Sequence, residues 1–167
     1  MRLGLRSLLF GTHQLVWHPV TVTLAWKWLY REWPDFKEFV CIIIHDWGYA
    51  RVREMDTDED TSHPYLGAEI ALALFGPKYG HLVSGHSRFL AERDGFETSD
   101  LCWADKASIK FDPEWFYLLR ARLSGELKVY RVMGARYGYC FLDESDEVWY
   151  RRFREYVLNV AREGAQV

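Results

Sequence analysis

Residues 36–48 read FKEFVCIIIHDWG, and this stretch decides the fold class. Its apolar side chains recur three and four residues apart, the spacing of one helix face, at Phe36, Val40, Ile43 and Ile44. Gly48 can end such a helix. The stretch therefore predicts an apolar helix with His45 and Asp46 at its end, where two polar side chains would face a core.

The same helical spacing continues on both sides of this stretch. It predicts further helices at 18–29, from 64 onward, through 82–90, over 99–109, from 113 onward, at 124–133 and at 145–162. Residues 50–62 break the pattern with charged and polar side chains and are predicted to form a loop. No segment alternates as a strand would, and no Gly- or Ser-rich linker divides the chain. We predict an all-α fold, a compact helical bundle.

Composition limits the kinds of partner. The chain has 167 residues, a formal charge of −3 and 49 % hydrophobic residues, which is typical of a globular domain. The slight acidic excess argues against a long nucleic acid as partner. The longest apolar run, residues 39–44, is far shorter than the ~20 residues that span a bilayer, so no membrane association is expected. The three cysteines form no C-x-x-C pair, and we predict a protein of a reducing compartment, the cytoplasm.

Several common motifs are absent from the sequence. It contains no Gly-rich phosphate loop, no H-E-x-x-H and no G-x-S-x-G. Residues 56–60 (DTDED) begin like a calcium loop, but Thr61 and Gly67 stand where that loop needs glycine and a bidentate glutamate. A solvated acidic loop is the preferred interpretation.

A set of histidines and aspartates remains, each near the end of a predicted helix or on its apolar side. The set comprises His18, His45, Asp46, His63, His86 and Asp105. Taken singly, each histidine has an ordinary explanation as a hydrogen-bonded core residue, and each aspartate as a cap or an ion-pair partner. Carboxylates on core-facing positions are costly to bury unless they are paired or bind metal. Several helices that each offer one such group to a shared interior favour a metal site.

This order of residues resembles the HD-domain superfamily of metal-dependent phosphohydrolases. The resemblance rests on the apolar run before His45-Asp46, on HPYLGAE at 63–69 and on ADK at 104–106, and it covers about residues 13–110. It implies an HD metal-binding core over 11–110. Residues 111–167 would then form a helical, aromatic-rich extension packed on the same domain.

The resemblance also implies a role for each ligand. His18, His45, Asp46 and Asp105 would bind one metal, and Asp46 would bridge to a second metal held by His63 and His86. His13 and His81 are rivals to His18 and His86 respectively, since each stands close to the preferred residue in the chain. The donor set suits Mn, Fe, Co, Ni or Zn and tolerates Mg, with one or two ions bound.

The implied activity is hydrolysis of a phosphate ester, a nucleotide or another small phosphorylated molecule, by a metal-activated water. Asp46, Lys106 and Arg88 are the candidate catalytic residues, and Lys106, Arg88 and Arg51 the candidate substrate-binding cations. Stacking of a base is open to four tryptophans, although core packing also explains them: Trp17, Trp47, Trp103 and Trp115. Two alternatives stay open: a di-iron oxygenase that uses the same ligands, and a non-catalytic nucleotide-binding module.

Overall fold

Helices form the regular structure of residues 1–165, the part of the chain that the computed structural model describes, apart from the side chain of Glu59. No strand occurs within these residues, so the predicted all-α fold is confirmed. The α-helices are α1 (Leu3–Phe10), α2 (Trp17–Tyr30), α3 (Phe36–Ile44), α4 (Asp58–Thr61), α5 (Pro64–Phe75), α6 (Pro77–Ser84), α7 (Arg88–Asp94), α8 (Asp100–Ala107), α9 (Glu114–Ser124), α10 (Glu126–Arg136) and α11 (Asp146–Gly164). Two 3₁₀ turns, η1 (Trp47–Arg51) and η2 (Ser108–Phe111), connect them.

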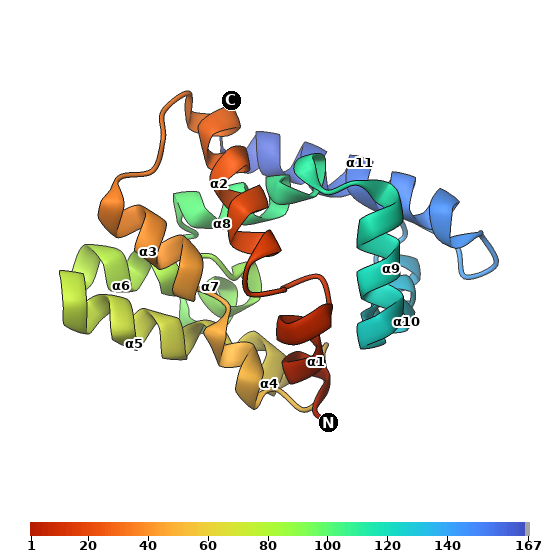
Figure 1. The fold of residues 1–167 in the computed structure, drawn as a ribbon, viewed down its shortest axis with the longest axis horizontal. Coiled ribbons are helices and arrows are strands. Elements are labelled where there is room, and N and C mark those ends of the chain that lie inside the picture. The colour runs from red at the N-terminus through yellow and green to blue at the C-terminus, as the bar shows by residue number, and fades with distance from the viewer. Residues whose placement is uncertain (166–167) are drawn as a thin grey trace.

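Helix α2 runs through the middle of the molecule (Figure 1). Helices α3, α5 and α6 lie on one side of it, and α9, α10 and α11 lie on the other. The main apolar core lies between α2, α3, α5, α6 and α8, and its fully buried members include Val22, Ile42, Val83 and Leu101. Burial of such side chains stabilises the fold by roughly 1.5–3 kcal/mol each.

The boundaries of α3 determine where the His-Asp pair lies. At the start, the Asp35 carboxylate accepts hydrogen bonds from the backbone N–H groups of Lys37 and Glu38, and the Glu38 side chain accepts one from the Asp35 N–H. This capping box fixes the first turn. At the other end the backbone leaves the helix at Asp46, with φ −97° and ψ 2°. His45 and Asp46 therefore stand at the inner end of a well-anchored apolar helix.

The structure corrects the prediction of one helix through 82–90. Helix α6 ends at Ser84, α7 begins at Arg88, and His86 lies in the connection between them. The Ser87 side chain accepts a hydrogen bond from the Leu90 N–H and caps α7. A capping serine after Gly85 was the sequence signal for this break, but the apolar spacing ran across it. The predicted 50–62 loop also contains the short α4, and the sequence analysis predicted no helix at α1.

A second core lies in the C-terminal third, where α9, α10 and α11 enclose Trp149, Tyr150 and Leu118. Helix α11 also packs against α8 and η2, so the two cores share an interface. Arg120 on α9 ties this region to the chain before α2, because its guanidinium donates to the Gly11 carbonyl and pairs with Asp112. The predicted boundary near residue 110 stays a prediction.

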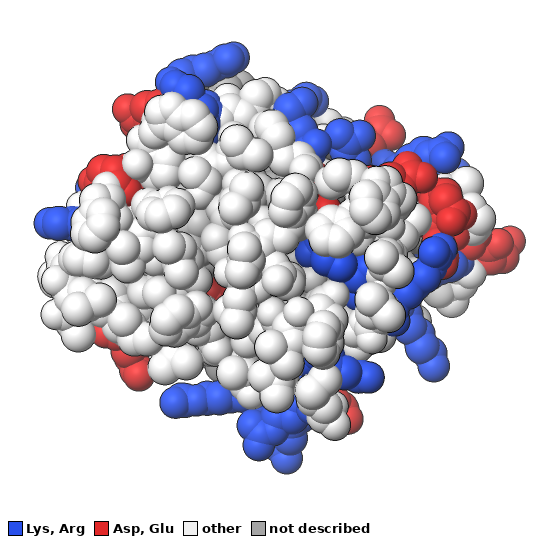
Figure 2. Space-filling model, viewed as in Figure 1, with Lys and Arg blue, Asp and Glu red and all other residues white. Residues whose placement is uncertain are grey.

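The surface carries its charges in a scattered pattern. On the face seen in Figure 2, most Lys and Arg side chains stand around the edge among Asp and Glu, and the middle is mostly uncharged with a blue patch to its right. Within residues 1–165, no helix is both long and apolar enough to cross a membrane. All three cysteines are buried and free of disulfides.

Close backbone packing brings η1 against the start of α5, and Gly48 makes it possible. A Cβ at Gly48 would lie 1.8 Å from the carbonyl oxygen of His63. We expect Gly48→Ala to lower the free energy of unfolding by about 1–3 kcal/mol and to reduce the predicted metal binding, because the backbone of His63, a predicted ligand, must shift. Urea unfolding and metal analysis measure the two effects. Gly76→Ala is the control: Gly76 has φ +91° but open space around it, so it should keep metal binding despite its conformational strain.

Candidate metal centre

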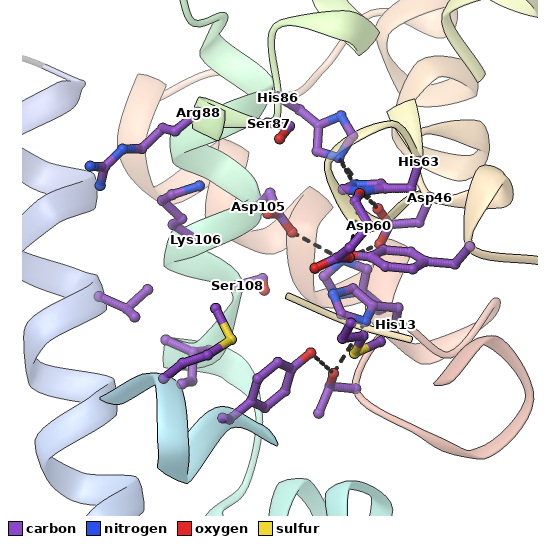
Figure 3. A pocket seen from close by; sticks show the side chains of 18 of the residues that line it. His13, Asp46, Asp60, His63, His86, Ser87, Arg88, Asp105, Lys106 and Ser108 are labelled. Atoms are coloured by element: carbon purple, nitrogen blue, oxygen red, sulfur yellow. Dashed lines mark hydrogen bonds and ion pairs between the residues drawn. The ribbon is translucent and has the colours of Figure 1, made fainter. Parts of the chain in front are cut away.

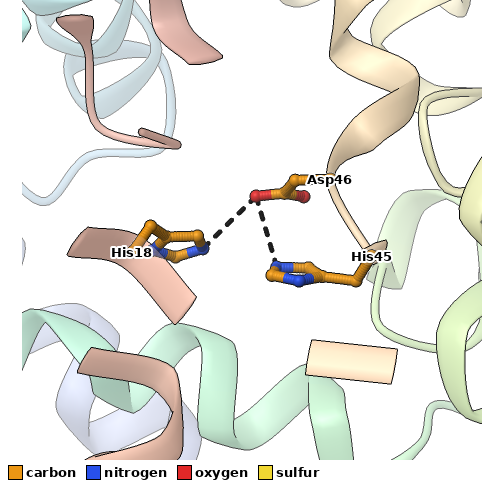
Figure 4. Close-up of side chains that lie close together, drawn as sticks. All are labelled: His18, His45 and Asp46. Carbon is orange, nitrogen blue, oxygen red and sulfur yellow. Dashed lines mark ion pairs between the residues drawn. The ribbon is translucent and has the colours of Figure 1, made fainter. Parts of the chain in front are cut away.

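Two groups of buried histidine and aspartate side chains share one carboxylate. The first group is His18, His45 and Asp46, and the second is Asp46, His63 and His86; within each group the donor atoms lie within 4.8 Å of one another. The side chains come from α2, from the end of α3, from the residue before α5 and from the α6–α7 connection. Figure 4 shows the first group and Figure 3 the wider surroundings. Buried His and Asp groups that can coordinate a metal ion are therefore present.

Asp46 offers a different oxygen to each group. Its Oδ2 lies 3.3 Å from His18 Nε2 and 3.2 Å from His45 Nε2 (Figure 4). Its Oδ1 lies 3.4 Å from His86 Nε2 and 3.6 Å from His63 Nε2. This division of the two oxygens is the arrangement that a carboxylate bridging two cations needs.

Asp105 on α8 adds a second carboxylate to the first group. Its Oδ1 lies 3.0 Å from His18 Nε2 and 3.8 Å from His45 Nε2. The first group can thus supply two imidazoles and two carboxylates. All six predicted ligand residues lie close together at this place. Helical spacing within each segment did not by itself require the segments to bring them together.

Backbone carbonyls set the tautomer of three imidazoles. His45 Nδ1 donates to the Ile42 carbonyl at 2.6 Å, His86 Nδ1 donates to the Val83 carbonyl at 2.6 Å, and His63 Nδ1 donates to the Asp60 carbonyl. A carbonyl oxygen can only accept, so Nδ1 carries the proton and a neutral ring has its lone pair on Nε2. Histidine ligands of metals are oriented by such hydrogen bonds.

The site contains buried polar atoms that a bound metal cation would satisfy. His18 Nε2, His45 Nε2 and Asp46 Oδ2 are buried and have no hydrogen-bond partner among the described residues. His63 Nε2 and His86 Nε2 lie 3.0 Å apart, although both Nδ1 atoms hold their protons for carbonyls. Two lone pairs at this distance repel each other unless a positive charge joins them. The residues present therefore fit one or two divalent ions, and nitrogen and oxygen donors without thiolate suit first-row metals such as Mn, Fe, Co, Ni and Zn.

The electrostatics of the site keep its carboxylates ionised. Burial acts to raise the pKa of Asp46, but the positive charges of His45 and His13 and the close approach of the His18 and His45 rings hold it well below its ordinary value. Burial, together with His86, lowers the pKa of His63 to about 3, so this ring is neutral. Burial also disfavours charge on His45, yet Asp46 and Asp105 raise its pKa to about 10. A proton and a divalent ion compete for His45 Nε2, so metal affinity should rise with pH.

A cavity of about 290 Å³ opens beside these groups. Arg88 at the start of α7 and Lys106 on α8 line it, whereas Arg51 is exposed at the end of η1 and does not. In Figure 3, Lys106 lies beside Asp105, and Arg88 extends away from the histidines toward α11. Lys106 is thus the predicted cation nearest to the two groups in that view. The two histidines considered as alternatives to His18 and His86 do not belong to the groups. His13 lies outside both groups but lines the cavity, and His81 is exposed on α6.

Tyr49 is a residue of the site that the sequence analysis missed. Its ring stacks on His63 with centroids 4.1 Å apart and on His13 with centroids 4.4 Å apart. The three rings form a stack in which Tyr49 supports one face of the His63 imidazole. Tyr49 follows His45-Asp46 by only three residues in η1, but its spacing carries no helical signal that marks it as part of the site.

Glu126 is the other missed residue, and it lies behind His13. Its carboxylate is fully buried and accepts hydrogen bonds from Ser7 Oγ (2.6 Å), Thr12 Oγ1 (2.6 Å) and Tyr130 OH (3.0 Å), with His13 Nδ1 at 3.2 Å. Burial acts to raise the pKa of Glu126, but the hydrogen bond and charge of His13 outweigh it and hold the pKa at about 2. Glu126 thus joins α10 to α1 and to the loop that carries His13.

The C-terminal third forms the rest of the cavity wall. The wall residues from this region are Tyr117, Tyr130, Met133, Tyr139, Phe153 and Val157. Phe153 and Val157 share a face of α11, and helical spacing alone does not distinguish a core position from a cavity wall. The four tryptophans considered for base stacking do not line the cavity. No protein-family model, curated protein or solved structure matches this chain.

The bridging position of Asp46 leads to a prediction about metal stoichiometry. Asp46→Asn keeps the shape of the side chain but removes its charge from both groups, so we expect the loss of all bound metal. His86→Gln should remove only the metal of the second group and leave one ion per chain. Inductively coupled plasma mass spectrometry after loading with Mn²⁺ measures both. His81→Gln is the matched control, an exposed histidine five residues earlier, and metal loss in this variant equal to that of His86→Gln would contradict the assignment.

Glu126 predicts an acid-sensitive component of stability. Its pKa lies below the ordinary value of 4.5, so its stabilising effect is complete above about pH 5 and is lost as the pH falls toward 2. The shift to about 2 corresponds to at most about 3 kcal/mol. With a chelator present, the free energy of unfolding of Glu126→Gln should change less between pH 5 and pH 3 than that of the wild type. Urea denaturation at each pH measures this, and the exposed Glu69→Gln should follow the wild type.

Proposed function

We propose that the protein is a metal-dependent phosphohydrolase of the HD-domain type. One observation carries the proposal: the carboxylate of Asp46 presents one oxygen to His18 and His45 and the other to His63 and His86. The order of these residues in the chain supports it, because it matches the HD pattern set out from the sequence. The cavity beside the two groups supplies room for a substrate.

The first metal would be held by His18, His45, Asp46 and Asp105, and the second by Asp46, His63 and His86. When bound, such ions lower the pKa of a water ligand toward 7 and neutralise charge on a phosphoryl group. The protein's own contribution is to fix the donors. The carbonyls of Ile42 and Val83 orient two imidazoles, and the Tyr49 ring supports a third.

Lys106 and Arg88 would bind the phosphate oxygens. Phosphate esters resist hydrolysis because their anionic oxygens repel a nucleophile, and fixed cations reduce that repulsion. Lys106 follows Asp105 directly on α8, and its Nζ lies 3.4 Å from Cys102 Sγ, a neutral contact that leaves its charge available. Arg88 stands next to Ser87 at the start of α7, where it can reach a more distant part of the same anion.

The direct test is an assay of the purified protein on simple phosphate esters with Mn²⁺, Mg²⁺, Co²⁺ or Ni²⁺ added separately. We expect release of inorganic phosphate that a chelator abolishes and that proceeds equally with and without O₂. Turnover that requires O₂ would overturn hydrolysis in favour of oxidation, and metal binding without any turnover would support a binding module instead.

Lys106→Met tests the proposed cation. Removing one charge-assisted hydrogen bond costs about 1.5–3 kcal/mol, so kcat/KM should fall by roughly 10- to 150-fold while metal content stays the same. The matched control is Lys110→Met. Lys110 is on η2, lies over the ring of Trp28 on α2 and does not line the cavity. Equal losses in both variants would contradict a contact between Lys106 and the substrate.

A further inference from the structure

We propose that the substrate is a phosphate monoester whose alcohol part is apolar and aromatic; this inference rests on the proposed function. The argument starts from the continuity of the cavity. The same cavity is lined at one end by residues of the two metal groups and at the other by the C-terminal helices. We call this second end the apolar chamber, and it is formed by Met133, Tyr139, Phe153 and Val157 together with Ile109 of η2.

The residues that form the apolar chamber carry no formal charge, and the side chain of Arg88 extends toward α11 beside them. Met133, Phe153 and Val157 are only half-buried although they are apolar and face an interior space, so their surfaces remain available to a ligand. A ligand that covers them gains the transfer free energy of its own apolar surface and of theirs. Methionine side chains adapt to the shape of an aromatic guest and make favourable contacts with its ring.

The rings of the chamber stack on neighbouring rings. Phe153 stacks on Trp149 with centroids 5.0 Å apart and an interplanar angle of 13°, and Tyr139 stacks on Tyr156 at 4.3 Å and 13°. Phe153 and Tyr139 lie at 29° to each other, nearly parallel. Fixed and nearly parallel rings offer an aromatic group a preformed surface, and little side-chain entropy is lost when it binds.

Three polar groups near the chamber are engaged with other parts of the protein, whereas the hydroxyls of Ser108, Tyr117 and Tyr139 line the same cavity. The hydroxyls of Tyr130 and Thr12 both donate to Glu126, and the Asp112 carboxylate is paired with Arg120. Lys106, beside Asp105, remains for the anionic end. The cavity thus has one end for a phosphate and another for an apolar ring.

The reaction is ordinary ester hydrolysis. Water adds its oxygen to phosphorus, the bond between phosphorus and the ester oxygen breaks, and the alcohol leaves with a proton from water. No oxidant or second substrate is needed.

The experiment compares 2-phenylethyl phosphate with ethyl phosphate, because both release a primary alcohol and differ only in the ring. With Mn²⁺ present, kcat/KM should be about 10- to 150-fold higher for the phenylethyl ester, the effect of burying one phenyl group. A readout that is independent of turnover is calorimetric binding of 2-phenylethylphosphonate, which should be tighter than that of ethylphosphonate by a similar factor.

Two variants locate the effect. Met133→Gln and Val157→Thr place a polar atom in the chamber with little change of volume, and they should remove most of the preference while the rate with ethyl phosphate stays the same. Val132→Thr is the matched control, since Val132 is the exposed neighbour of Met133 on α10 and does not line the cavity.

The outcomes separate the two proposals. Equal kcat/KM for both esters, or a nucleoside 5′-monophosphate preferred over the phenylethyl ester tenfold or more, overturns the inference and leaves the hydrolase standing. A preference that survives both chamber variants also overturns it. No hydrolysis of any ester, combined with tighter binding of the phenylethylphosphonate that Met133→Gln abolishes, overturns the hydrolase and supports the chamber as a binding site for an aromatic group.

Discussion

A buried carboxylate surrounded by four imidazole nitrogens is the constraint on which the rest of the structure depends. The Asp46 side chain is only 7 % exposed, and four Nε2 atoms lie 3.2–3.6 Å from its oxygens. The cost of removing such a charge from water is several kcal/mol unless cations or hydrogen bonds compensate it. The helices that carry the ligands meet here at their ends or connections, where side chains converge without interrupting the apolar core. Metal binding by these groups would therefore stabilise the arrangement of α2, α3, α5 and α8 as well as serve chemistry.

A second layer holds this centre in position, and it links the two halves of the chain. The Tyr49 ring stacks on the rings of both His63 and His13. His13 in turn contacts the carboxylate of Glu126 on α10 through its Nδ1 atom. Glu126 also binds the hydroxyls of Ser7 and Thr12, so one buried acid joins the N-terminal helix, the loop before α2 and the C-terminal third. The aromatic-rich region after residue 110 is thus part of the structure that supports and encloses the site.

The sequence predicted the features that depend on neighbouring residues. The apolar face and Gly48 identified α3, and the position of histidines and aspartates near helix ends identified all six members of the two groups. The break at residues 85–87 was missed because Leu82, His86 and Phe89 keep helical spacing across it, although Ser87 caps the following helix. The residues of the chamber wall could not be told from core residues in the sequence. Phe153 and Val157 have the spacing of core residues, and only the three-dimensional packing shows that they border a cavity. Arg51 looked suitable because it closely follows Asp46, but η1 leaves it in solvent.

Under the proposed function, the two ends of the cavity have different roles and are formed by different parts of the chain. Under the proposed function, the metal groups and Lys106 interact with the phosphoryl group, which is the same in every phosphate monoester, so they cannot discriminate among alcohols. Discrimination must come from contacts that differ between substrates, and transition-state binding gains from such remote contacts when they position the reacting end. Those contacts lie mainly on α10, α11 and the loop between them, which carries Tyr139. Substitutions there can change the preferred alcohol while the ligands of α2, α3 and α8 stay in place, because the chamber residues donate no atom to either metal group.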